Sequence, residues 1–239
     1  MIRFVAQTGS TNAELARQIR DGTTLDDGCW IVANRQTAGR GRQGRPWFDG
    51  AGNFMGSTLV RARVGDPALP SLALVAGLAV HGAVSKHLPP PIQPMLKWPN
   101  DLMVKGAKIA GILLERLEDV VVVGIGVNLS VAPQIDGRET IALSAFGPSP
   151  DRDLFAHDLA AAFVDELIRW RGFGIAPLVS RWQSVAHPAG TALAVGEPGE
   201  PALHGRFAGL DADGALLLGL PDGTTRTVNA GEVRLAGPA

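Results

Sequence analysis

The sequence has one cysteine, almost no net charge and no long hydrophobic run. Because Cys29 has no second cysteine to pair with, a disulfide framework within the chain is excluded, which fits a reducing cytoplasm. The 22 Lys and Arg residues nearly balance the 23 Asp and Glu residues, which argues against a protein built mainly to bind nucleic acid or an acidic membrane surface. The longest apolar stretch, near residues 72–84, contains Gly77, His81 and Gly82, so it is too mixed to span a bilayer. The first residues also lack the apolar segment of a signal peptide. We therefore expect a cytoplasmic protein without a membrane partner.

The 239 residues, 46% of them hydrophobic, suffice for one large domain or for a large domain with a small one. Apolar periodicity predicts strands at residues 2–6, 29–34, 53–64, 95–104, 108–117 and 120–129. It predicts helices from residue 11, where Thr11 and Glu14 form a capping box, and at 70–88, 151–171 and 175–185. The strand at 120–129 is apolar throughout, which is typical of a central strand.

The pattern changes after about residue 188. Short apolar runs alternate there with GEPGEP, DADG and PDG, which are turn signals at hairpin spacing. We therefore predict a catalytic domain at residues 1–187, with a mixed sheet covered by helices on one face. A small antiparallel β-barrel should follow at 188–239.

Residues 36–47 form a loop with an unusual composition, QTAGRGRQGRPW. Arginine presents planar donors suited to carboxylate and phosphate, and glycine lets a backbone approach such a ligand. Because the segment contains no acidic residue, we expect residues 37–49 to be mobile when empty and ordered by an anionic ligand. A dinucleotide fingerprint is disfavoured, since Pro46 and Trp47 stand where a helix should begin. A nucleic-acid-binding loop and a plain solvated loop remain open.

Two further segments carry polar or conformationally special residues beside apolar strands. In KWPNDL, at residues 97–102, a cation, an aromatic ring, an amide and a carboxylate stand together, and Lys108 opens the apolar run KIAGIL. A cation at the mouth of such a strand indicates an anionic partner. In GIGVN, at residues 124–128, glycines interrupt a strand, which favours either a ligand lying against the backbone or close packing.

These segments together resemble bacterial biotin–protein ligases in their order and spacing. The matching stretches are STN at 10–12, QTAGRGRQGRPW at 36–47, KWPNDL at 97–102, KIAGIL at 108–113, GIGVNL at 124–129, and DADGALLL with a closing GEV in the tail. The resemblance implies an α+β fold: a mixed sheet covered by helices, as in class II synthetases, followed by an SH3-like β-barrel. It also implies formation of biotinyl-5′-AMP from biotin and ATP, and transfer of biotin to a lysine of a biotin carboxyl carrier protein.

The resemblance also assigns roles to individual residues. It implies biotin binding by Ser10, Thr11, Asn12, Gln36, Arg40, Gly41, Arg42, Lys108, Gly111, Gly124 and Gly126. It implies ATP binding by Arg42, Trp47, Asn100, Lys108 and Asn128. Lys108 and Arg42 would stabilise charge on the phosphate together with Mg²⁺ carried by ATP, with no metal site of protein residues. Asp101 is the candidate to orient the acceptor lysine and help it lose its proton, with a turn or capping role as its alternative.

Three other readings concern function. A lipoate or octanoate ligase of the same fold would need fewer polar groups in its acyl pocket, so the STN segment favours biotin. A nucleic-acid-binding module using the arginine loop is the alternative outside enzymes. Many family members carry an N-terminal DNA-binding domain, and because the ligase motifs begin at Ser10 we expect the monofunctional form without DNA binding. A homodimer is left open, because family members pair through sheet edges or work alone.

Overall fold

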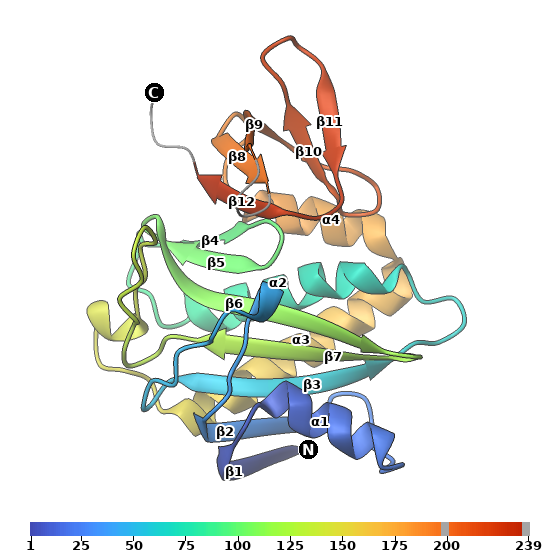
Figure 1. The fold of residues 1–239 in the computed structure, drawn as a ribbon, viewed down its shortest axis with the longest axis vertical. Helices are drawn as coiled ribbons and strands as arrows, with labels where there is room; N and C mark the ends of the chain where they lie inside the picture. The colour runs from blue at the N-terminus through green and yellow to red at the C-terminus, as the bar shows by residue number, and fades with distance from the viewer. Residues whose placement is uncertain (197–200, 236–239) are drawn as a thin grey trace.

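The computed structural model describes residues 1–196 and 201–235. Two β-sheets lie one above the other, with helices packed against them (Figure 1). The larger sheet consists of β1 (Ile2–Thr8), β2 (Trp30–Gln36), β3 (Phe54–Arg61), β4 (Pro94–Lys97), β5 (Asp101–Val104), β6 (Ala107–Leu117) and β7 (Val120–Val127). The helices are α1 (Thr11–Arg20), α2 (Leu72–Ser85), α3 (Arg152–Phe173) and α4 (Ile175–Ser184), and short 3₁₀ turns occur at Arg42–Gly44, Leu69–Ser71 and Leu143–Ala145.

The larger sheet is mixed. Its strand order is β1-β2-β3-β7-β6-β5-β4. Only β1 and β2 are parallel, and every other neighbouring pair is antiparallel. β7 lies in the middle and all of its residues are buried, as its unbroken apolar sequence predicts. The predicted α+β class with a mixed sheet is therefore confirmed.

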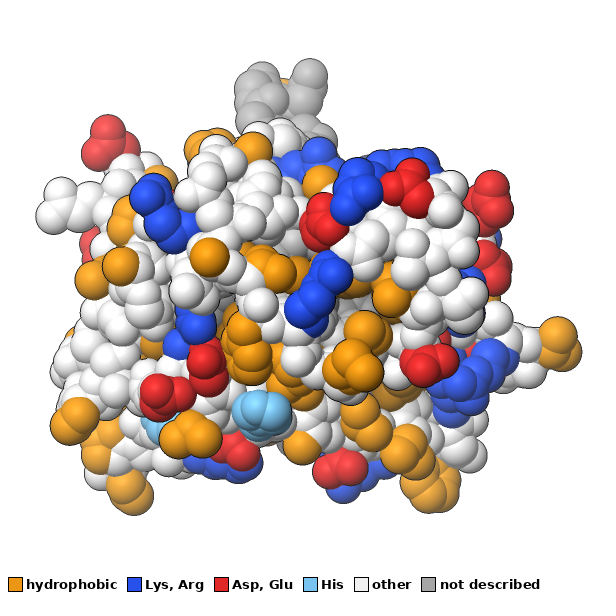
Figure 2. All heavy atoms as spheres, turned by 90° about the horizontal axis from the view of Figure 1, so that it is seen from below, with side chains coloured by type: hydrophobic (Ala, Val, Ile, Leu, Met, Phe, Trp, Pro, Cys, Tyr) orange, Lys and Arg blue, Asp and Glu red, His pale blue; other side chains and the backbone are white. Residues whose placement is uncertain are grey.

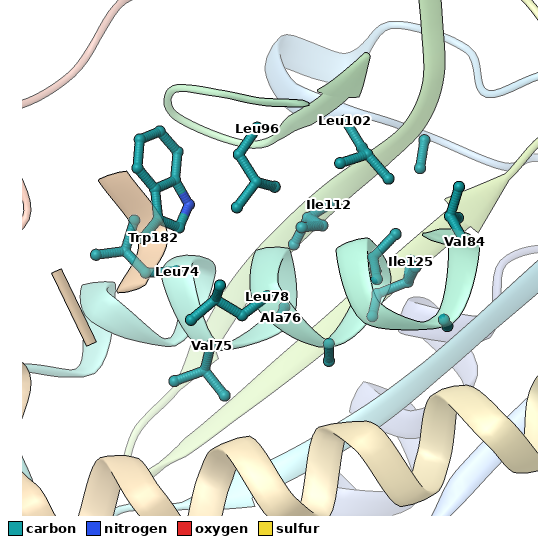
Figure 3. Close-up of a cluster of buried hydrophobic side chains, with 14 of the residues drawn as sticks. Leu74, Val75, Ala76, Leu78, Val84, Leu96, Leu102, Ile112, Ile125 and Trp182 are labelled. Atoms are coloured by element: carbon teal, nitrogen blue, oxygen red, sulfur yellow. The ribbon is translucent and has the colours of Figure 1, made fainter. Parts of the chain in front are cut away.

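The helices cover both faces of this sheet. Val121, Val123 and Ile125 of β7 belong to the core that contains α2 and α3, whereas Val120 and Val122 pack with Leu15 of α1. α2 is apolar on all sides because it lies between the sheet and α3, and Figure 3 shows its side chains meeting those of the strands. The prediction of helices on one face is wrong for α1. Helical periodicity shows that a helix has a buried side, but not which face of a sheet receives it.

The predicted capping box at the start of α1 is also wrong. Ser10, not Thr11, is the N-cap residue, and its hydroxyl accepts a hydrogen bond from the backbone N–H of Ala13 at 3.4 Å. Glu14 instead accepts hydrogen bonds from Arg17 and Gln18. This one-residue shift places Thr11 and Asn12 in the first turn of α1, where both are buried.

The strand predicted at residues 95–104 is two strands. β4 and β5 pair antiparallel, with Lys97 opposite Asp101, so the chain reverses at Trp98, Pro99 and Asn100. The apolar residues on both sides of this turn conceal it from a periodicity analysis. The reversal is what puts Asp101 beside Lys97 at the end of the hairpin.

The tail forms a second, five-stranded sheet. Its strands are β8 (Ala192–Gly196), β9 (Leu203–Leu210), β10 (Leu216–Gly219), β11 (Thr225–Val228) and β12 (Glu232–Leu235), in the order β11-β10-β9-β8-β12. All neighbours are antiparallel, and the DADG turn has the carboxylate of Asp211 accepting from the backbone N–H groups of Asp213 and Ala215, each at 2.9 Å. Of the GEPGEP turn, residues 197–200 lie outside the described residues. Closure into an SH3-like barrel stays a prediction.

The second sheet packs directly on the hairpin of β4 and β5. The indole N–H of Trp98 donates to the carbonyl of Gly214 at 3.1 Å, and the ammonium of Lys97 donates to the carbonyl of Val233 at 2.8 Å. Its apolar residues join the same hydrophobic core as α2 and α4. The domain boundary at 187/188 therefore stays a prediction. Within residues 1–196 and 201–235, no helix has the length and apolar character needed to cross a membrane.

Candidate active site

A cavity lies on the α1 side of the larger sheet, between the sheet, the arginine loop and β12. Its volume is about 140 Å³, well above the ~10–15 Å³ that a single water requires, so an organic ligand can enter. Every residue that the sequence singled out lines it: Ser10, Thr11, Asn12, Gln36, Arg40, Gly41, Arg42, Trp47, Asn100, Asp101, Lys108, Gly111, Gly124, Gly126 and Asn128. The fold therefore brings the predicted residues together, whereas the role of each stays a prediction.

The arginine loop between β2 and β3 folds back on itself over this cavity. Arg40 and Pro46 form an isolated antiparallel bridge, and the backbone N–H of Trp47 donates to the carbonyl of Gly39 at 2.9 Å. The reversal passes through Gln43 (φ 57°) and Gly44 (φ 70°). A left-handed conformation is unusual for a non-glycine residue, so the turn depends on these two positions. It directs the half-buried Trp47 back onto the sheet.

The glycines of β6 and β7 make room for side chains on the sheet surface. A Cβ atom at Gly126 would overlap the indole ring of Trp47, and one at Gly124 would overlap the amide of Asn12. At Gly111 a Cβ atom would lie 3.0 Å from the Trp47 ring. These three positions share one face, because Gly111 pairs with Gly126 and side chains alternate along a strand. The absence of side chains at these glycines thus leaves space for Trp47 and Asn12 to lie directly against the backbone of the sheet.

Lys108, Asp101 and Lys97 form an ion cluster at one end of the cavity. Lys108 and Lys97 each donate to a different oxygen of Asp101, the Lys97 contact being 3.0 Å. Burial raises the pKa of Asp101, but the two ammonium groups together outweigh it and hold that pKa at about 2. Burial lowers the pKa of Lys108, and the Asp101 carboxylate opposes that shift. The ring of Trp47 lies 5.7 Å from the Lys108 ammonium, so this cation faces the cavity as well as its carboxylate.

A polar cluster forms the other end of the cavity, at the start of α1. The Gln36 side-chain carbonyl accepts from the backbone N–H of Thr11 at 2.7 Å and from its hydroxyl at 3.1 Å. The hydroxyls of Thr11 and Ser57 are 2.6 Å apart, and Ser57 donates to the side-chain oxygen of Asn12. Sequence analysis missed Ser57. Ser57 is buried in β3 directly beside Thr58, so its hydroxyl is not distinguished in the sequence from that of its neighbour.

All three arginines of the loop have partners from distant parts of the chain, and for Arg40 and Arg45 that partner is acidic. Arg40 pairs with Glu115 of β6 at 2.8 Å, and Arg45 forms a two-pronged contact with Glu232 of β12. Arg42 donates to the side-chain oxygen of Asn100 at 3.1 Å and to the carbonyl of Gly231 at 3.2 Å. The sequence argument for a mobile loop assumed no acidic neighbours, and that premise is wrong in the folded protein. Ordering of the loop by a ligand stays a prediction.

Glu232 joins the second sheet to the cavity. It pairs with Arg138 as well as Arg45, and the hydrogen bond from Arg45 is the main reason that its pKa is lowered to about 2. Glu232, Val233 and Arg138 line the cavity, and sequence analysis assigned a role to none of them. The closing GEV, noted as part of the resemblance, was the signal for Glu232 and Val233, and Arg138 had none.

The two asparagines assigned to the nucleotide are both anchored by backbone carbonyls. The side-chain N–H of Asn100 donates to the carbonyl of Ile112 at 2.8 Å, and that of Asn128 to the carbonyl of Ile141 at 3.1 Å. Asn128 is almost fully buried at 3% exposure. These contacts fix the orientation of both amides, so each side chain holds its amide group in one position at the cavity.

The donor set does not fit a resident metal ion. In the part of the chain that the structure describes, no three His, Cys, Asp or Glu residues gather in a way that could hold one. Among the described residues, two carboxylates line the cavity, Asp101 in the ion cluster and Glu232 in β12. Each of them forms ion pairs with two cationic side chains. That a magnesium ion would arrive on the phosphates of a nucleotide, as the family resemblance implies, stays a prediction.

On the face turned to the viewer in Figure 2, basic and acidic side chains are intermingled and hydrophobic ones lie between them. Together with the paired arginines of the loop, this distribution offers no continuous basic track on that face. This face consequently gives no support to a nucleic-acid-binding surface.

Comparison with known proteins identifies relatives over almost the whole chain. Residues 4–131 match the family described as "Biotin/lipoate A/B protein ligase family", and residues 194–235 match "Biotin protein ligase C terminal domain". A biotin–[acetyl-CoA-carboxylase] ligase of Paracoccus denitrificans is 37% identical, the alignment covering 98% of this chain and 100% of that protein. A ligase of the same name from Mycobacterium tuberculosis is 37% identical over 96% of this chain and 86% of its own. The biotin protein ligase of Aquifex aeolicus, solved with biotin and ATP, superposes with a TM-score of 0.84 at 26% identity, covering 98% of both chains.

Proposed function

The chain belongs to the biotin/lipoate A/B protein ligase family, and from this premise we propose that it activates biotin with ATP and transfers it to a lysine of an acceptor protein. The observation that carries the proposal is the cavity itself, which joins a buried polar cluster at one end to an ion cluster at the other. The ureido ring of biotin has N–H and C=O groups that need partners when buried, and the polar side chains of Ser10–Asn12 and Gln36, which line the cavity, are placed to offer them.

The same polar cluster distinguishes biotin from lipoate. The polar side chains of Ser10, Thr11 and Asn12 line this end of the cavity and can exchange hydrogen bonds with a ureido ring, whereas a plain acyl chain offers them no such partner. A site built to hydrogen-bond one substrate therefore rejects an analogue that lacks the partner groups. We accordingly assign biotin rather than lipoate or octanoate to this chain.

In the first half-reaction, an oxygen of the biotin carboxylate attacks the α-phosphorus of ATP, a P–O bond forms, and pyrophosphate leaves. Two anions must approach each other, so cationic groups that stabilise the charge on the phosphoryl oxygens supply the main catalytic need. We assign this task to Lys108 and Arg42, both of which line the cavity. Biotin would lie toward Ser10–Asn12, Gln36, Arg40 and Gly41, and the nucleotide toward Trp47, Asn100 and Asn128.

In the second half-reaction, the acceptor amine attacks the acyl carbon, and AMP leaves. The amine must be neutral to react. Because the pKa of Asp101 is held at about 2, its carboxylate is a weak base at neutral pH. We therefore propose that Asp101 positions Lys108 and orients the amine, and that it is not the final proton acceptor.

The remaining assignments follow from the activity. We propose a biotin carboxyl carrier protein as the acceptor and the cytoplasm, where ATP is abundant, as the compartment. Mg²⁺ would enter as the counter-ion of ATP, and none of the steps above is assigned to it. Self-association into a homodimer is a separate proposal, which size-exclusion chromatography with light scattering decides.

Biotin-dependent exchange of labelled pyrophosphate into ATP tests the proposed function. The expected result is exchange with biotin and none with lipoate or octanoate. Exchange that requires lipoate or octanoate instead would identify the other ligase of this family. No exchange with any acid, combined with salt-dependent binding of an oligonucleotide, would support a binding module in its place.

The ion cluster predicts a specific effect of pH. Asp101→Asn removes the negative charge that raises the pKa of Lys108, so burial then lowers that pKa further. The ammonium is charged only below its pKa, and the rate therefore falls as pH rises through it. We expect the alkaline limb of pyrophosphate exchange to move to lower pH in this variant. A pH–rate profile checks this, with Asp119→Asn at an exposed ion pair as the control. An alkaline limb at the same pH in the variant would show that ionisation of Lys108 does not determine the alkaline fall in rate.

A further inference from the structure

Glu115 contacts two parts of the cavity that are far apart in sequence. One carboxylate oxygen accepts a hydrogen bond from the side-chain N–H of Asn12 at 2.7 Å. The other accepts from the guanidinium of Arg40 at 2.8 Å. A single side chain thus joins the first turn of α1 to the arginine loop.

The position of Glu115 follows from the strand that carries it. Side chains alternate along β6, so Gly111 and Glu115 point to the same face, toward α1 and the cavity. The Glu115 side chain is 29% exposed and follows the apolar residues Ile112–Leu114 in the strand. A half-buried carboxylate at such a position needs donors, and Asn12 and Arg40 supply them.

The contact with Asn12 fixes the orientation of a residue at the polar end of the cavity. An ionised carboxylate accepts hydrogen bonds and cannot donate them, so it draws the amide N–H₂ of Asn12 toward itself. The Asn12 oxygen then faces Ser57, which donates to it, and the amide lies flat over Gly124. Glu115 therefore holds one member of the polar cluster in a single orientation.

The contact with Arg40 acts on the loop. Arg40 is exposed. Its ion pair with Glu115 is a charged contact that joins the arginine loop to β6. Arg40 also begins the bridge to Pro46, after which the chain places Trp47 on the sheet. The ion pair that keeps Arg40 against β6 therefore also helps to keep the second half of the loop, up to Trp47, folded over the cavity.

We propose that Glu115 is a positioning residue that couples an occupied biotin pocket to closure of the arginine loop. The inference rests on the proposed function, since it takes biotin as the occupant of the polar cluster. Biotin bound against Asn12 would restrain the amide that Glu115 already contacts, and the shared carboxylate would then be a more firmly held partner for Arg40. The closed loop then retains the adenylate, which water would otherwise destroy.

Glu115→Gln tests the coupling because it changes only one of the two contacts. The side-chain oxygen of glutamine can still accept from Asn12, but its N–H₂ group then faces the donors of Arg40. We expect release of biotinyl-adenylate, measured without acceptor, to become roughly fivefold faster, as for loss of a partly exposed ion pair. The single-turnover rate of adenylate formation should stay within about twofold of that of the unmodified protein, because Glu115 is remote from the ion cluster.

Arg40→Gln provides an independent approach from the exposed partner. It should also speed release roughly fivefold, and the double variant should be no faster than either single one, because both remove the same contact. Glu14→Gln is the matched control, since it removes an arginine pair of the same 2.8 Å length on the outer side of α1.

The outcomes separate the two proposals. Absence of biotin-dependent exchange in the unmodified protein would overturn the proposed function. Normal exchange together with unchanged release in both single variants would overturn the coupling alone. Multiplicative effects in the double variant, roughly 25-fold, would show that Glu115 and Arg40 act separately and would overturn it too.

Discussion

Lys108→Ala is expected to slow formation of biotinyl-adenylate by roughly 10²–10³-fold, the range for removing one preorganised electrostatic group. The Lys108 ammonium lies at the mouth of β6, paired with Asp101 and facing the ring of Trp47. When the biotin carboxylate approaches the α-phosphate, this cation stabilises the charge of both. Its contribution is therefore larger in the transition state than in the complex with biotin alone.

Measuring both half-reactions on one folded variant checks this prediction. Transfer from chemically supplied biotinyl-adenylate should suffer less than its formation, because two anions no longer have to meet. Lys108→Arg should restore little activity, since the planar guanidinium is larger and places its charge elsewhere. If pyrophosphate exchange in Lys108→Ala remains within a few-fold of normal, Arg40 or Arg42 becomes the better candidate for the catalytic cation.

Gly126→Ala should lower adenylate formation by about 10²-fold, although it adds only a methyl group. A Cβ atom at Gly126 overlaps the Trp47 ring, which must retreat by about 1 Å or more to reach an ordinary separation of about 3.5 Å. A displacement of this size at a positioning residue can cost about two orders of magnitude in rate. Because Trp47 also faces Lys108, the change disturbs the nucleotide side of the cavity.

The control for Gly126→Ala is Gly82→Ala in α2, where an added Cβ atom meets nothing within 4 Å. Alanine favours a helix over glycine by about 0.5–1 kcal/mol, so this control should raise the free energy of unfolding and leave activity unchanged. Pyrophosphate exchange and thermal unfolding of both variants provide the comparison. A Gly126→Ala enzyme with normal KM for ATP and normal rate would mean that Trp47 has no part in nucleotide binding.

The fold could be predicted from the sequence wherever one strand or helix carries its own signal. The continuous run at residues 120–129 indicated a central strand, and β7 at Val120–Val127 is central. Errors arose where the deciding interaction lies outside the segment. The apolar residues on both sides of Pro99 conceal the reversal between β4 and β5, and the face that α1 covers depends on the whole sheet.

The same distinction applies to the candidate site. Residues in compact motifs, such as Lys97–Asp101 and Gln36–Trp47, could be singled out because several unusual residues stand together. Ser57, Glu115 and Glu232 lie outside these two motifs, and partners of theirs lie 46, 103 and 187 positions away. Glu115 did carry a signal, since it shares the two-residue alternation of Gly111 within β6. That signal shows which face it occupies, but not that Arg40 meets it there.

β12 supplies Glu232 and Val233 to a cavity whose opposite wall begins at Ser10. A ribosome delivers these two walls in sequence order, at about 5–20 residues per second. During translation the polar cluster near α1 can form well before its counterpart from β12 exists. A nascent chain would thus hold arginines without the glutamate that restrains two of them. The full set of ion pairs that holds Arg45 and Arg138 therefore forms only after β12 has been synthesised.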